Sequence, residues 1–595
     1  MARHFDLVLL HAPSVYDFRE KTILYGPVSD LVPPSPMFEM YPIGFTTIAE
    51  YLERHGYRVR LVNLAVRMLR DPKFDAEAMI RKLDTVAFGI DLHWLPHAHG
   101  AIEVARLVKK YHPWTPVILG GLSASYFHQE LMQYPEVDYV VRGDSTEEPM
   151  RQLMACLRRG AEPVDVPNVT WRARTGQVHE NPFTYVPASL DNLAFDGSYV
   201  VRAVVRDRDL ASYLPYQNWP GYPITAAFTC RGCTMGCVSC GGSAGAFRTC
   251  FQRTAPAYRS PELLARDVAA IGHFSGGPIF IIGDIRQPGD DYAAALLAAL
   301  RRERIRNPVI IEFFRPVSRE FMQQVAEALP KFTVEVSLES HDPEVRRAFG
   351  KPYGNEDIEA SMQAILEAGA QRLDVFFIIG LPKQTFASVM ETIDYCGSLL
   401  ERFGRDEAPS RPPFRGVRRD GASDGRLAPF ISPLAPFLDP GSQAFEHPEK
   451  LGYRLFYRTL EEHRQALVQP TWKRILNYET AWMTRDEIVA ASYEAGLRLN
   501  RLKARYGLVD ERTAAATEER ILKARAMLEK IEALLARGDP ASQAEELRRL
   551  KPEVDQVSIS TVCEKRELEL PIGFLKLRLL EAFWHFIARP DRSHR

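Results

Sequence analysis

The stretch Thr229-Cys230-Arg231-Gly232-Cys233-Thr234-Met235-Gly236-Cys237-Val238-Ser239-Cys240 decides how this chain of 595 residues is interpreted. It holds four of the 8 cysteines, and a fifth, Cys250, follows closely. The other three cysteines are scattered along the chain, as small buried apolar residues often are. Cysteines this sparse do not build a disulfide scaffold, so their clustering indicates a site.

Two ligand sets fit this spacing. Cys230/Cys233 and Cys237/Cys240 are two Cys-x-x-Cys pairs of the kind that bind zinc, but only three residues separate them. Cys233, Cys237 and Cys240 instead form Cys-x-x-x-Cys-x-x-Cys. Three such thiolates can cap three irons of a four-iron cube and leave the fourth open to bind a substrate and pass it an electron. The loop follows the apolar run 224–228, where a barrel carries its active-site loops.

Apolar runs alternate with helical patterns on both sides of the loop. The first 155 residues contain five strand candidates and intervening helices, which predict a parallel sheet with helices on both faces. A second alternating region predicts a full or partial barrel of five or six βα units. The expected strands are 5–10, 58–63, 85–90, 117–120 and 139–141 in the first region, and 224–228, 278–282, 309–314, 333–338, 375–379 and 428–432 in the second.

The remaining segments have their own composition. Residues 162–221 are rich in Pro, Asn and Arg and are interpreted as a connection with some strand content. Residues 406–426 are rich in Arg, Pro, Gly and Asp, a composition typical of a solvated, mobile loop. Apolar residues at steps of three and four over 519–537 predict a helix in a mostly helical C-terminal region.

The cysteine loop resembles the signature of radical S-adenosylmethionine (radical SAM) enzymes, and the resemblance extends over about 226–440. Leu338-Glu339-Ser340-His341-Asp342-Pro343, followed by Lys351, resembles the fourth strand of that family and the helix start after it. Gly380-Leu381-Pro382 resembles the turn after the fifth strand, and Ile282-Gly283-Asp284 the end of the second.

The N-terminal region resembles the cobalamin (B12)-binding domain that precedes the barrel in the class B radical SAM methyltransferase-like branch. Its matching segments are Tyr41-Pro42-Ile43-Gly44, Leu119-Gly120-Gly121-Leu122-Ser123-Ala124-Ser125 and Arg142-Gly143-Asp144-Ser145-Thr146-Glu147-Glu148. A Gly pair after a strand lets the backbone approach a ligand and frees N–H groups for a phosphate-bearing tail.

The resemblance implies an α/β chain of several parts. A Rossmann-like, flavodoxin-like B12-binding domain is expected over 1–160, and a linker region over 161–220. A partial (β/α)6 TIM-type radical SAM barrel is expected over 221–440, with a mobile loop at 405–426, and a helical domain over 441–595.

The resemblance also implies three cofactors and their contacts. Cys233, Cys237 and Cys240 would hold a [4Fe-4S] cluster whose open iron binds S-adenosylmethionine. Further cofactor contacts are expected from Gly120, Gly121 and Ser123 on cobalamin, and from Ser337 and Glu339 near S-adenosylmethionine. From its residue type, Arg315 at the end of the third barrel strand is expected to meet a carboxylate bidentately.

Several residues depart from the family pattern. The first strand ends in His11-Ala12-Pro13-Ser14 rather than in the Asp-x-His-x-x-Gly motif that carries a cobalt ligand in many cobalamin domains. Asp91-Leu92-His93 follows the third strand instead, so His93 is not assigned to cobalt, and a loop histidine with satisfied hydrogen bonds is favoured. Ser239 replaces a common aromatic residue near the adenine, and Cys230 and Cys250 receive no role.

The implied reaction is reductive cleavage of S-adenosylmethionine to a 5′-deoxyadenosyl radical, followed by cobalamin-dependent methylation of an unactivated carbon. A cyclisation, rearrangement or oxidation without methyl transfer is the second hypothesis. A methylthiotransferase would carry three further upstream cysteines, but residues 1–229 contain only Cys156. A non-catalytic iron–sulfur or zinc regulatory protein is the last alternative.

Composition sets the expected partners. Lys plus Arg is 75 and Asp plus Glu is 76, so the net charge of −1 gives no bulk attraction to nucleic acid or to an anionic membrane. No apolar run reaches the roughly 18 residues of a membrane span, and the N-terminus lacks a signal-peptide core, so a cytoplasmic protein is expected. The partners expected are an electron donor such as flavodoxin or ferredoxin and a small-molecule or peptide substrate, whose identity the sequence does not indicate.

Overall fold

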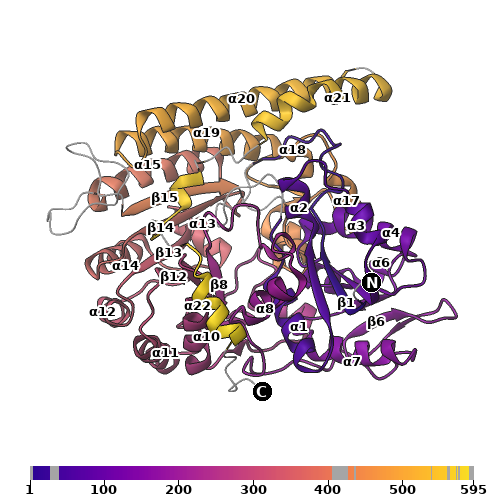
Figure 1. The fold of residues 1–595 in the computed structure, drawn as a ribbon. Helices are drawn as coiled ribbons and strands as arrows, with labels where there is room; N and C mark the ends of the chain where they lie inside the picture. Colours follow the sequence, from indigo (N-terminus) through magenta and orange to yellow (C-terminus); the bar gives the residue numbers. More distant parts are fainter. Residues whose placement is uncertain are drawn as a thin grey trace.

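The computed structural model describes residues 4–26, 39–404, 426–433, 437–537, 539–558, 563, 565–570, 572–573 and 576–588. Figure 1 shows two α/β bodies side by side under a layer of long helices. This confirms the predicted α/β fold class and the order of its parts. Of the predicted mobile loop, residues 405–425 lie outside the described residues.

The first body is built on a sheet of order β2-β1-β3-β4-β5-β6-β7. Strands β1 to β5 are parallel, and their order 2-1-3-4-5 is flavodoxin-like, with the reversal between β1 and β3. Near-continuous apolar runs form these strands because both faces are covered by helices. The bounds are β1 His4–His11, β2 Val59–Asn63, β3 Asp84–Asp91, β4 Val117–Gly120 and β5 Tyr139–Val141, with the larger helices α1 Ile43–Arg54, α4 Ala98–Tyr111 and α7 Glu147–Arg158.

The sheet continues beyond residue 160, into the stretch predicted as a linker region. Strands β6 (Val169–Arg172) and β7 (Val178–Glu180) add to its edge in antiparallel pairs. A helix that composition did not indicate, α8 (Ser198–Asp207), follows them. Strands β6 and β7 and helix α8 therefore pack with the first sheet, whereas Ser189 and Leu190, between β7 and α8, pair with Tyr258 after the cysteine loop.

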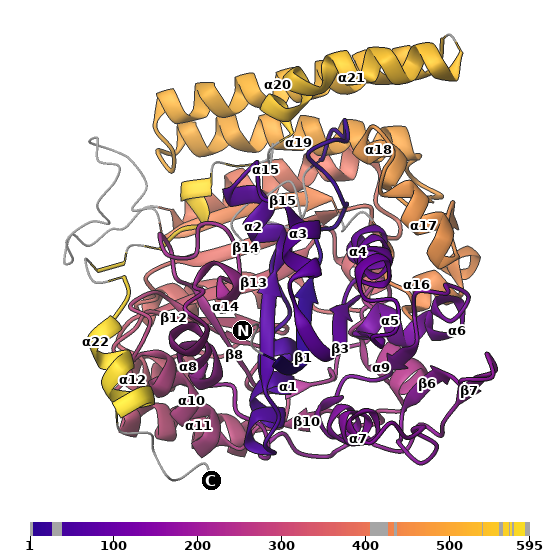
Figure 2. The same cartoon turned by 45° about the vertical axis from the view of Figure 1, so that its right-hand side comes forward.

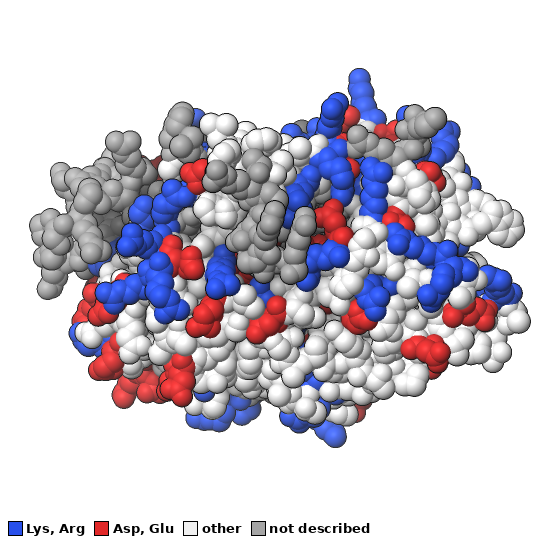
Figure 3. All heavy atoms as spheres, turned by 60° about the horizontal axis from the view of Figure 1, so that its bottom comes forward, with Lys and Arg blue, Asp and Glu red and all other residues white. Residues whose placement is uncertain are grey.

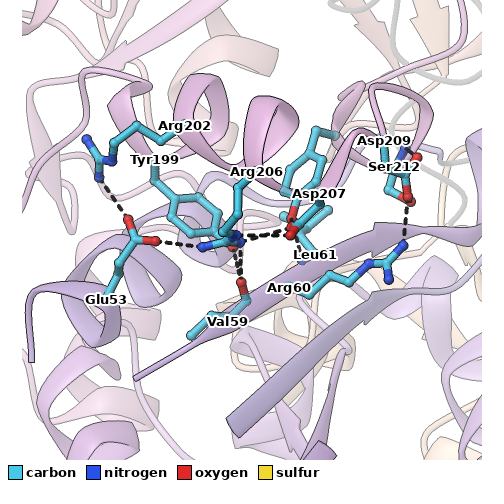
Figure 4. A network of polar contacts seen from close by, with 11 residues as sticks. Glu53, Val59, Arg60, Leu61, Tyr199, Arg202, Arg206, Asp207, Asp209 and Ser212 are labelled. Carbon is cyan, nitrogen blue, oxygen red and sulfur yellow. Dashed lines mark hydrogen bonds and ion pairs between the residues drawn. The ribbon is translucent and has the colours of Figure 1, made fainter. Parts of the chain in front are cut away.

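Charged side chains fix α8 against the first sheet (Figure 4). Arg206 donates to Glu53 of α1 at 2.7 Å and to the Val59 carbonyl of β2 at 2.8 Å. Arg60 of β2 reaches Asp209 at 2.9 Å. These part-buried contacts join the end of the first body to its beginning.

The second body is a six-stranded sheet of order β15-β14-β13-β12-β11-β8, with every pair parallel. The two edge strands, β15 and β8, are not paired with each other, so the barrel is partial. Its strands are β8 Thr225–Phe228, β11 Ile279–Ile282, β12 Val309–Phe313, β13 Phe332–Glu339, β14 Leu373–Ile379 and β15 Leu427–Pro433. Its larger helices are α10 Pro261–Ile271, α11 Asp290–Glu303, α12 Arg319–Ala328, α14 Asn355–Glu367 and α15 Phe386–Phe403.

The long helices α19 (Arg485–Arg505), α20 (Glu511–Leu535) and α21 (Pro540–Val557) form the upper layer in Figures 1 and 2. Helix α19 packs on α15 and β15, so this layer covers the barrel side where the chain leaves its last strand. No helix of the described chain is both long and apolar enough to cross a bilayer.

The last described segment returns to the amino ends of the barrel strands. Arg372, just before β14, donates to the carbonyls of Glu567 and Leu568. The Gly276 N–H, before β11, donates to the Lys576 carbonyl at 2.8 Å, and Leu570 N–H donates to the hydroxyl of Tyr222. We call the described residues 567–570, 572–573 and 576–578 the strap. It ends at α22 (Leu579–Ala582), drawn in yellow beside α10 in Figure 1.

The beginning of the chain is held by its late segments. The Leu24 N–H donates to the Pro470 carbonyl, and the Trp472 N–H donates to the Leu24 carbonyl, both at 2.9 Å. Ser558, after α21, donates its hydroxyl to the Ile23 carbonyl at 2.9 Å. Over the face in Figure 3, Lys and Arg are interspersed with Asp and Glu, in line with the near-zero net charge.

Candidate functional site: the cluster loop and the edge of the first sheet

The cysteine loop leaves the barrel directly after β8. Strand β9 (Cys230–Arg231) pairs antiparallel with β10 (Ala257–Tyr258) and clamps its base. Within the loop, backbone N–H groups donate to the predicted cluster thiols: Met235 N–H to Cys233 Sγ and Gly242 N–H to Cys240 Sγ, both at 3.3 Å. Such N–H···S bonds stabilise thiolate sulfur, the form that binds metal.

The spacing of the thiols favours a cluster over a single zinc ion. Zinc–sulfur bonds of about 2.3 Å require ligand atoms about 4 Å apart. Among the described residues, the only group of three potential ligands with atoms all within 4.8 Å is His11, Asp91 and His93. The loop cysteines are therefore spread more widely than a mononuclear zinc site needs, which fits the larger iron–sulfur cube.

The loop is pinned by the end of α13 (Pro343–Phe349). Val238 N–H donates to the Phe349 carbonyl at 3.0 Å. Gly350 follows at φ 111°, and a Cβ there would lie 2.8 Å from the Gly236 carbonyl oxygen. Only glycine fits such a close approach at positive φ. Burial raises the pKa of the Cys237 thiol to about 11, and the positive charge of Lys351 opposes this rise.

Lys351 also organises the end of β13. Its ammonium pairs with Glu339 Oε1 and donates to the Ser337 carbonyl at 2.7 Å, with the Glu339 and Lys351 side chains each 4% exposed. Glu339 has φ 67°, and the β13–β14 register shifts between Ser337 and Glu339. Strained backbone of this kind clusters at ligand sites. Among the described residues, buried Glu339 Oε2 has no partner, so it is an acceptor ready for an ammonium such as that of S-adenosylmethionine.

Three carboxylates lie side by side on neighbouring strands of the barrel. Glu312 of β12, Glu335 of β13 and Asp374 of β14 are register partners, while their sequence neighbours pack outward in the core. Since side chains alternate along strands, the three acids share the opposite, interior face. Burial raises the pKa of Glu312 to about 7, and burial together with Asp374 and Glu312 raises that of Glu335 well above its usual value.

The predicted cobalamin contacts lie at the carboxyl edge of the first sheet. Gly120 ends β4, and Gly121, at φ 121°, is the residue before α5 (Leu122–Tyr126). A Cβ on Gly121 would lie 2.4 Å from His93 Cα, so only glycine fits at this position beside the loop that follows β3. Ser123 is buried. Ser125, which was not selected from the sequence, accepts from Gly143 N–H and donates to the Gly121 carbonyl.

Beside the Gly pair lies a group of histidines around one carboxylate. Nδ1 of His93 lies 2.7 Å and Nδ1 of His11 lies 2.9 Å from Asp91 Oδ2. The His97 ring lies 4.6 Å from that of His93 and 4.9 Å from that of His11. Burial disfavours ionisation of Asp91, but its two histidine partners outweigh burial and hold its pKa well below the usual range.

Three polar links join this edge to the cluster loop. The Trp94 indole N–H donates to Asp439 Oδ1 at 2.7 Å, and Gly241 N–H, next to Cys240, donates to Asp439 Oδ2 at 3.0 Å. Arg231 pairs with Glu147 through both nitrogens of its guanidinium head. The third link joins Arg253 and Asp144.

Because these three links join the carboxyl edge of the first sheet to the cluster loop and the residues after it, the loop and the sheet edge face each other. Helix α9 (Ala244–Phe251), after the loop, packs against α5 (Figure 2). The sequence segment Arg142–Glu148 thus supplies Asp144 and Glu147 as docking groups, a role its motif did not reveal.

Among the described residues, no hydrogen bond or ion pair joins the Arg315 side chain to Ser337 or Glu339. Arg315 follows β12 with an exposed side chain, and its carbonyl accepts from Arg286 at 2.7 Å. Cys230 Sγ donates to the Gly232 carbonyl and accepts from Thr229, and Cys250 Sγ packs closely on Gly441. These contacts are those of packed thiols.

Two family models match the chain in the order of its bodies. The B12 binding domain matches residues 35–152, and the Radical SAM superfamily matches residues 228–396. The cofactors that these domains imply are cobalamin for the first, and a [4Fe-4S] cluster with S-adenosylmethionine for the second. The thiol spacing, the unpaired Glu339 oxygen and the glycine turn at the sheet edge fit these groups.

Two curated relatives are methyl-transferring enzymes by name. Hopanoid C-3 methylase of Methylococcus capsulatus is 28% identical over 337 residues, covering 52% of this chain and 59% of the relative. Cytidylyl-2-hydroxyethylphosphonate methyltransferase of Streptomyces wedmorensis is 21% identical, covering 37% and 47%. The chain thus spans less than two thirds of the length of either relative.

Solved structures share the fold. The radical S-adenosylmethionine methyltransferase TsrM from Kitasatospora setae, with cobalamin and a [4Fe-4S] cluster bound, has a TM-score of 0.55 at 15% identity, covering 89% of this chain and 100% of that one. The cobalamin-dependent S-adenosylmethionine radical enzyme OxsB has a TM-score of 0.52 at 12% identity, covering 93% and 72%.

Proposed function

Because the chain belongs to the family that joins a B12-binding domain to a radical SAM domain, we propose that it is a cobalamin-dependent radical SAM methyltransferase that methylates an unactivated carbon. The observation that carries the proposal is the approach of the cluster loop to the edge of the first sheet, bridged by Asp439 between Trp94 and Gly241. A methyl donor and a radical source must act on one substrate, so they must be held within reach of it.

The bound groups supply one-electron cleavage of S-adenosylmethionine and methyl transfer through cobalt, while the protein holds and encloses them. Cys233, Cys237 and Cys240 bind the cluster. Glu339, held by Lys351, accepts from the ammonium group of S-adenosylmethionine through its unpaired Oε2. Gly120, Gly121 and Ser123 border the cobalamin tail. The strap covers the amino ends of strands β11 and β14, which leaves the carboxyl side of the barrel for substrate entry.

The partners follow from the chemistry. A one-electron reduction of the cluster requires a donor, for which flavodoxin or ferredoxin is proposed. The substrate is proposed to be a small molecule or a peptide, because the net charge of −1 gives no bulk attraction to a polyanion.

The test is anaerobic reconstitution with iron, sulfide and cobalamin, followed by reduction in the presence of S-adenosylmethionine. We expect 5′-deoxyadenosine and S-adenosylhomocysteine, the latter diagnostic of methyl transfer. Cys237→Ala should lose iron and both products, whereas the matched control Cys156→Ala, a cysteine in α7, should keep them. 5′-Deoxyadenosine without S-adenosylhomocysteine would favour a cobalamin reaction without methyl transfer. Zinc without iron would contradict the proposal altogether.

A further inference from the structure

One carboxylate orients two histidines at the place where the first sheet reverses its strand order. His11 ends β1 and Asp91 ends β3, and β1 and β3 are neighbours at the reversal. In open α/β sheets this switch point is where ligands bind, beyond the carboxyl ends of the strands. Asp91, His11 and His93 also form the only group of three potential metal ligands in the described chain whose ligand atoms all lie within 4.8 Å of one another.

The two histidines differ in access. His11 is fully buried, whereas the His93 side chain is 27% exposed. Nδ1 of His93 lies 2.7 Å from Asp91 Oδ2, and in the tautomer that donates this hydrogen bond the lone pair is on Nε2. No described residue forms a hydrogen bond with that Nε2. The imidazole is thus held at one nitrogen and open at the other.

The contacts of His93 hold it at the same edge of the sheet as the Gly pair. Gly121 lies against the His93 backbone, and the His97 ring packs on the imidazole. The next residue, Trp94, is tied through Asp439 to the cluster loop. His93 therefore stands between the proposed cobalamin tail site and the barrel.

We propose that Nε2 of His93 is a protein ligand to the cobalt of bound cobalamin, and that Asp91 and His11 are positioning residues for it. The inference rests on the proposed binding of cobalamin. A metal-ligating histidine almost always donates its second N–H to a carboxylate or carbonyl, which fixes the tautomer and raises the basicity of the ligating nitrogen. Asp91 makes that contact here, after the third strand, in a chain whose first strand lacks the Asp-x-His motif.

The test uses the paramagnetic resonance spectrum of protein-bound cob(II)alamin, produced with a mild reductant that leaves the cluster diamagnetic. One axial nitrogen-14 splits each cobalt line into a triplet, and nitrogen-15 splits it into a doublet. The protein is labelled with nitrogen-15 histidine and loaded with unlabelled cobalamin, so a protein histidine gives doublets and the benzimidazole base of the cofactor gives triplets.

We expect doublets in the wild-type protein and in His112→Gln, whose histidine lies at the far end of α4. We expect their loss in His93→Ala, with triplets restored by unlabelled imidazole. Asp91→Asn should keep the nitrogen splitting but change its size, because the ring loses its ionised acceptor.

Other spectra would overturn the inference. Triplets or unsplit lines in the wild-type protein would exclude a histidine ligand, and doublets that persist in His93→Ala would assign the ligand to another histidine. Both outcomes leave cobalamin bound and the proposed function intact. Failure of the purified protein to retain cobalamin would instead overturn the inference and the proposed function together.

Discussion

Replacing Lys351 by Met removes the ammonium that compensates Glu339 at the end of β13. The two side chains are each 4% exposed, and their charged atoms lie 2.5 Å apart. At an effective dielectric constant of about 20, the attraction at that separation is about 7 kcal/mol, and desolvation of the two ions offsets several kcal/mol of it. Removing one partner of a buried pair leaves the other charge uncompensated, so we expect Lys351→Met to lower the free energy of unfolding by about 3–5 kcal/mol.

The assay is a double-mutant cycle of Lys351→Met, Glu339→Gln and the double variant, with urea unfolding of the cluster-free protein. Each single variant should be strongly destabilised, and the double variant should lose less than the sum, because it buries no unpaired charge. Arg454→Met with Glu479→Gln is the matched control. That pair is 72% exposed at the arginine, so its coupling should be below about 1 kcal/mol. Strict additivity at Lys351 and Glu339 would refute the reasoning.

Three further changes have defined outcomes. Asp439→Asn leaves one acceptor for the Trp94 and Gly241 N–H groups, so urea unfolding should show a loss of about 1–3 kcal/mol; an unchanged value would contradict the bridge. Burial raises the pKa of Glu312 from 4.5 to about 7, so its protonated form adds stability that is complete below pH 4.5 and lost as the pH rises through about 7. Glu312→Gln should remove that loss, which is measured as the melting temperature of both proteins between pH 4.5 and about 7. If the two melting temperatures changed in parallel with pH, the carboxyl would not be buried as described. Gly121→Ala should weaken cobalamin retention and lower the melting temperature, whereas the control Gly176→Ala, with positive φ but nothing within 4 Å, should only lower it slightly; equal effects would contradict the close approach at Gly121.

The helices and strands of both bodies could be predicted wherever local signals agreed. Helices α1 and α10 form in the stretches expected to be helical between strands, with Pro42 just before the first and Pro261 at the start of the second. Helix α8 was missed although Tyr199 and Ala203 recur at helical spacing. The Pro- and Asn-rich surroundings obscured this pattern, and only tertiary contacts of Arg206 with the first sheet show where the helix belongs.

The candidate site divides in the same way. Cysteine spacing along a single loop is a local signal, so the three cysteines could be singled out from the sequence, and their role as cluster ligands stays a prediction. Ser337 and Glu339 were both expected near S-adenosylmethionine, but the register shift between them could not be read from the sequence. Lys351 contacts the Ser337 carbonyl and the Glu339 carboxylate. The contact of His11 with Asp91 joins residues 80 positions apart, and no local pattern announces such a pairing.

The contacts of residues 23–25 with the last third of the chain mean that the first body cannot be expressed as an intact unit without that later part. The first strand's downstream neighbours are held by the Pro470 and Trp472 backbone and by Ser558, which belong to the last third of the chain. A fragment ending after the first sheet would expose Leu24, which is fully buried in the whole protein, and leave its backbone unpaired. A fragment that contains only the B12-binding domain should therefore not fold stably, even though its sheet is complete. A protein split into two chains between the two family domains should fail for the same reason.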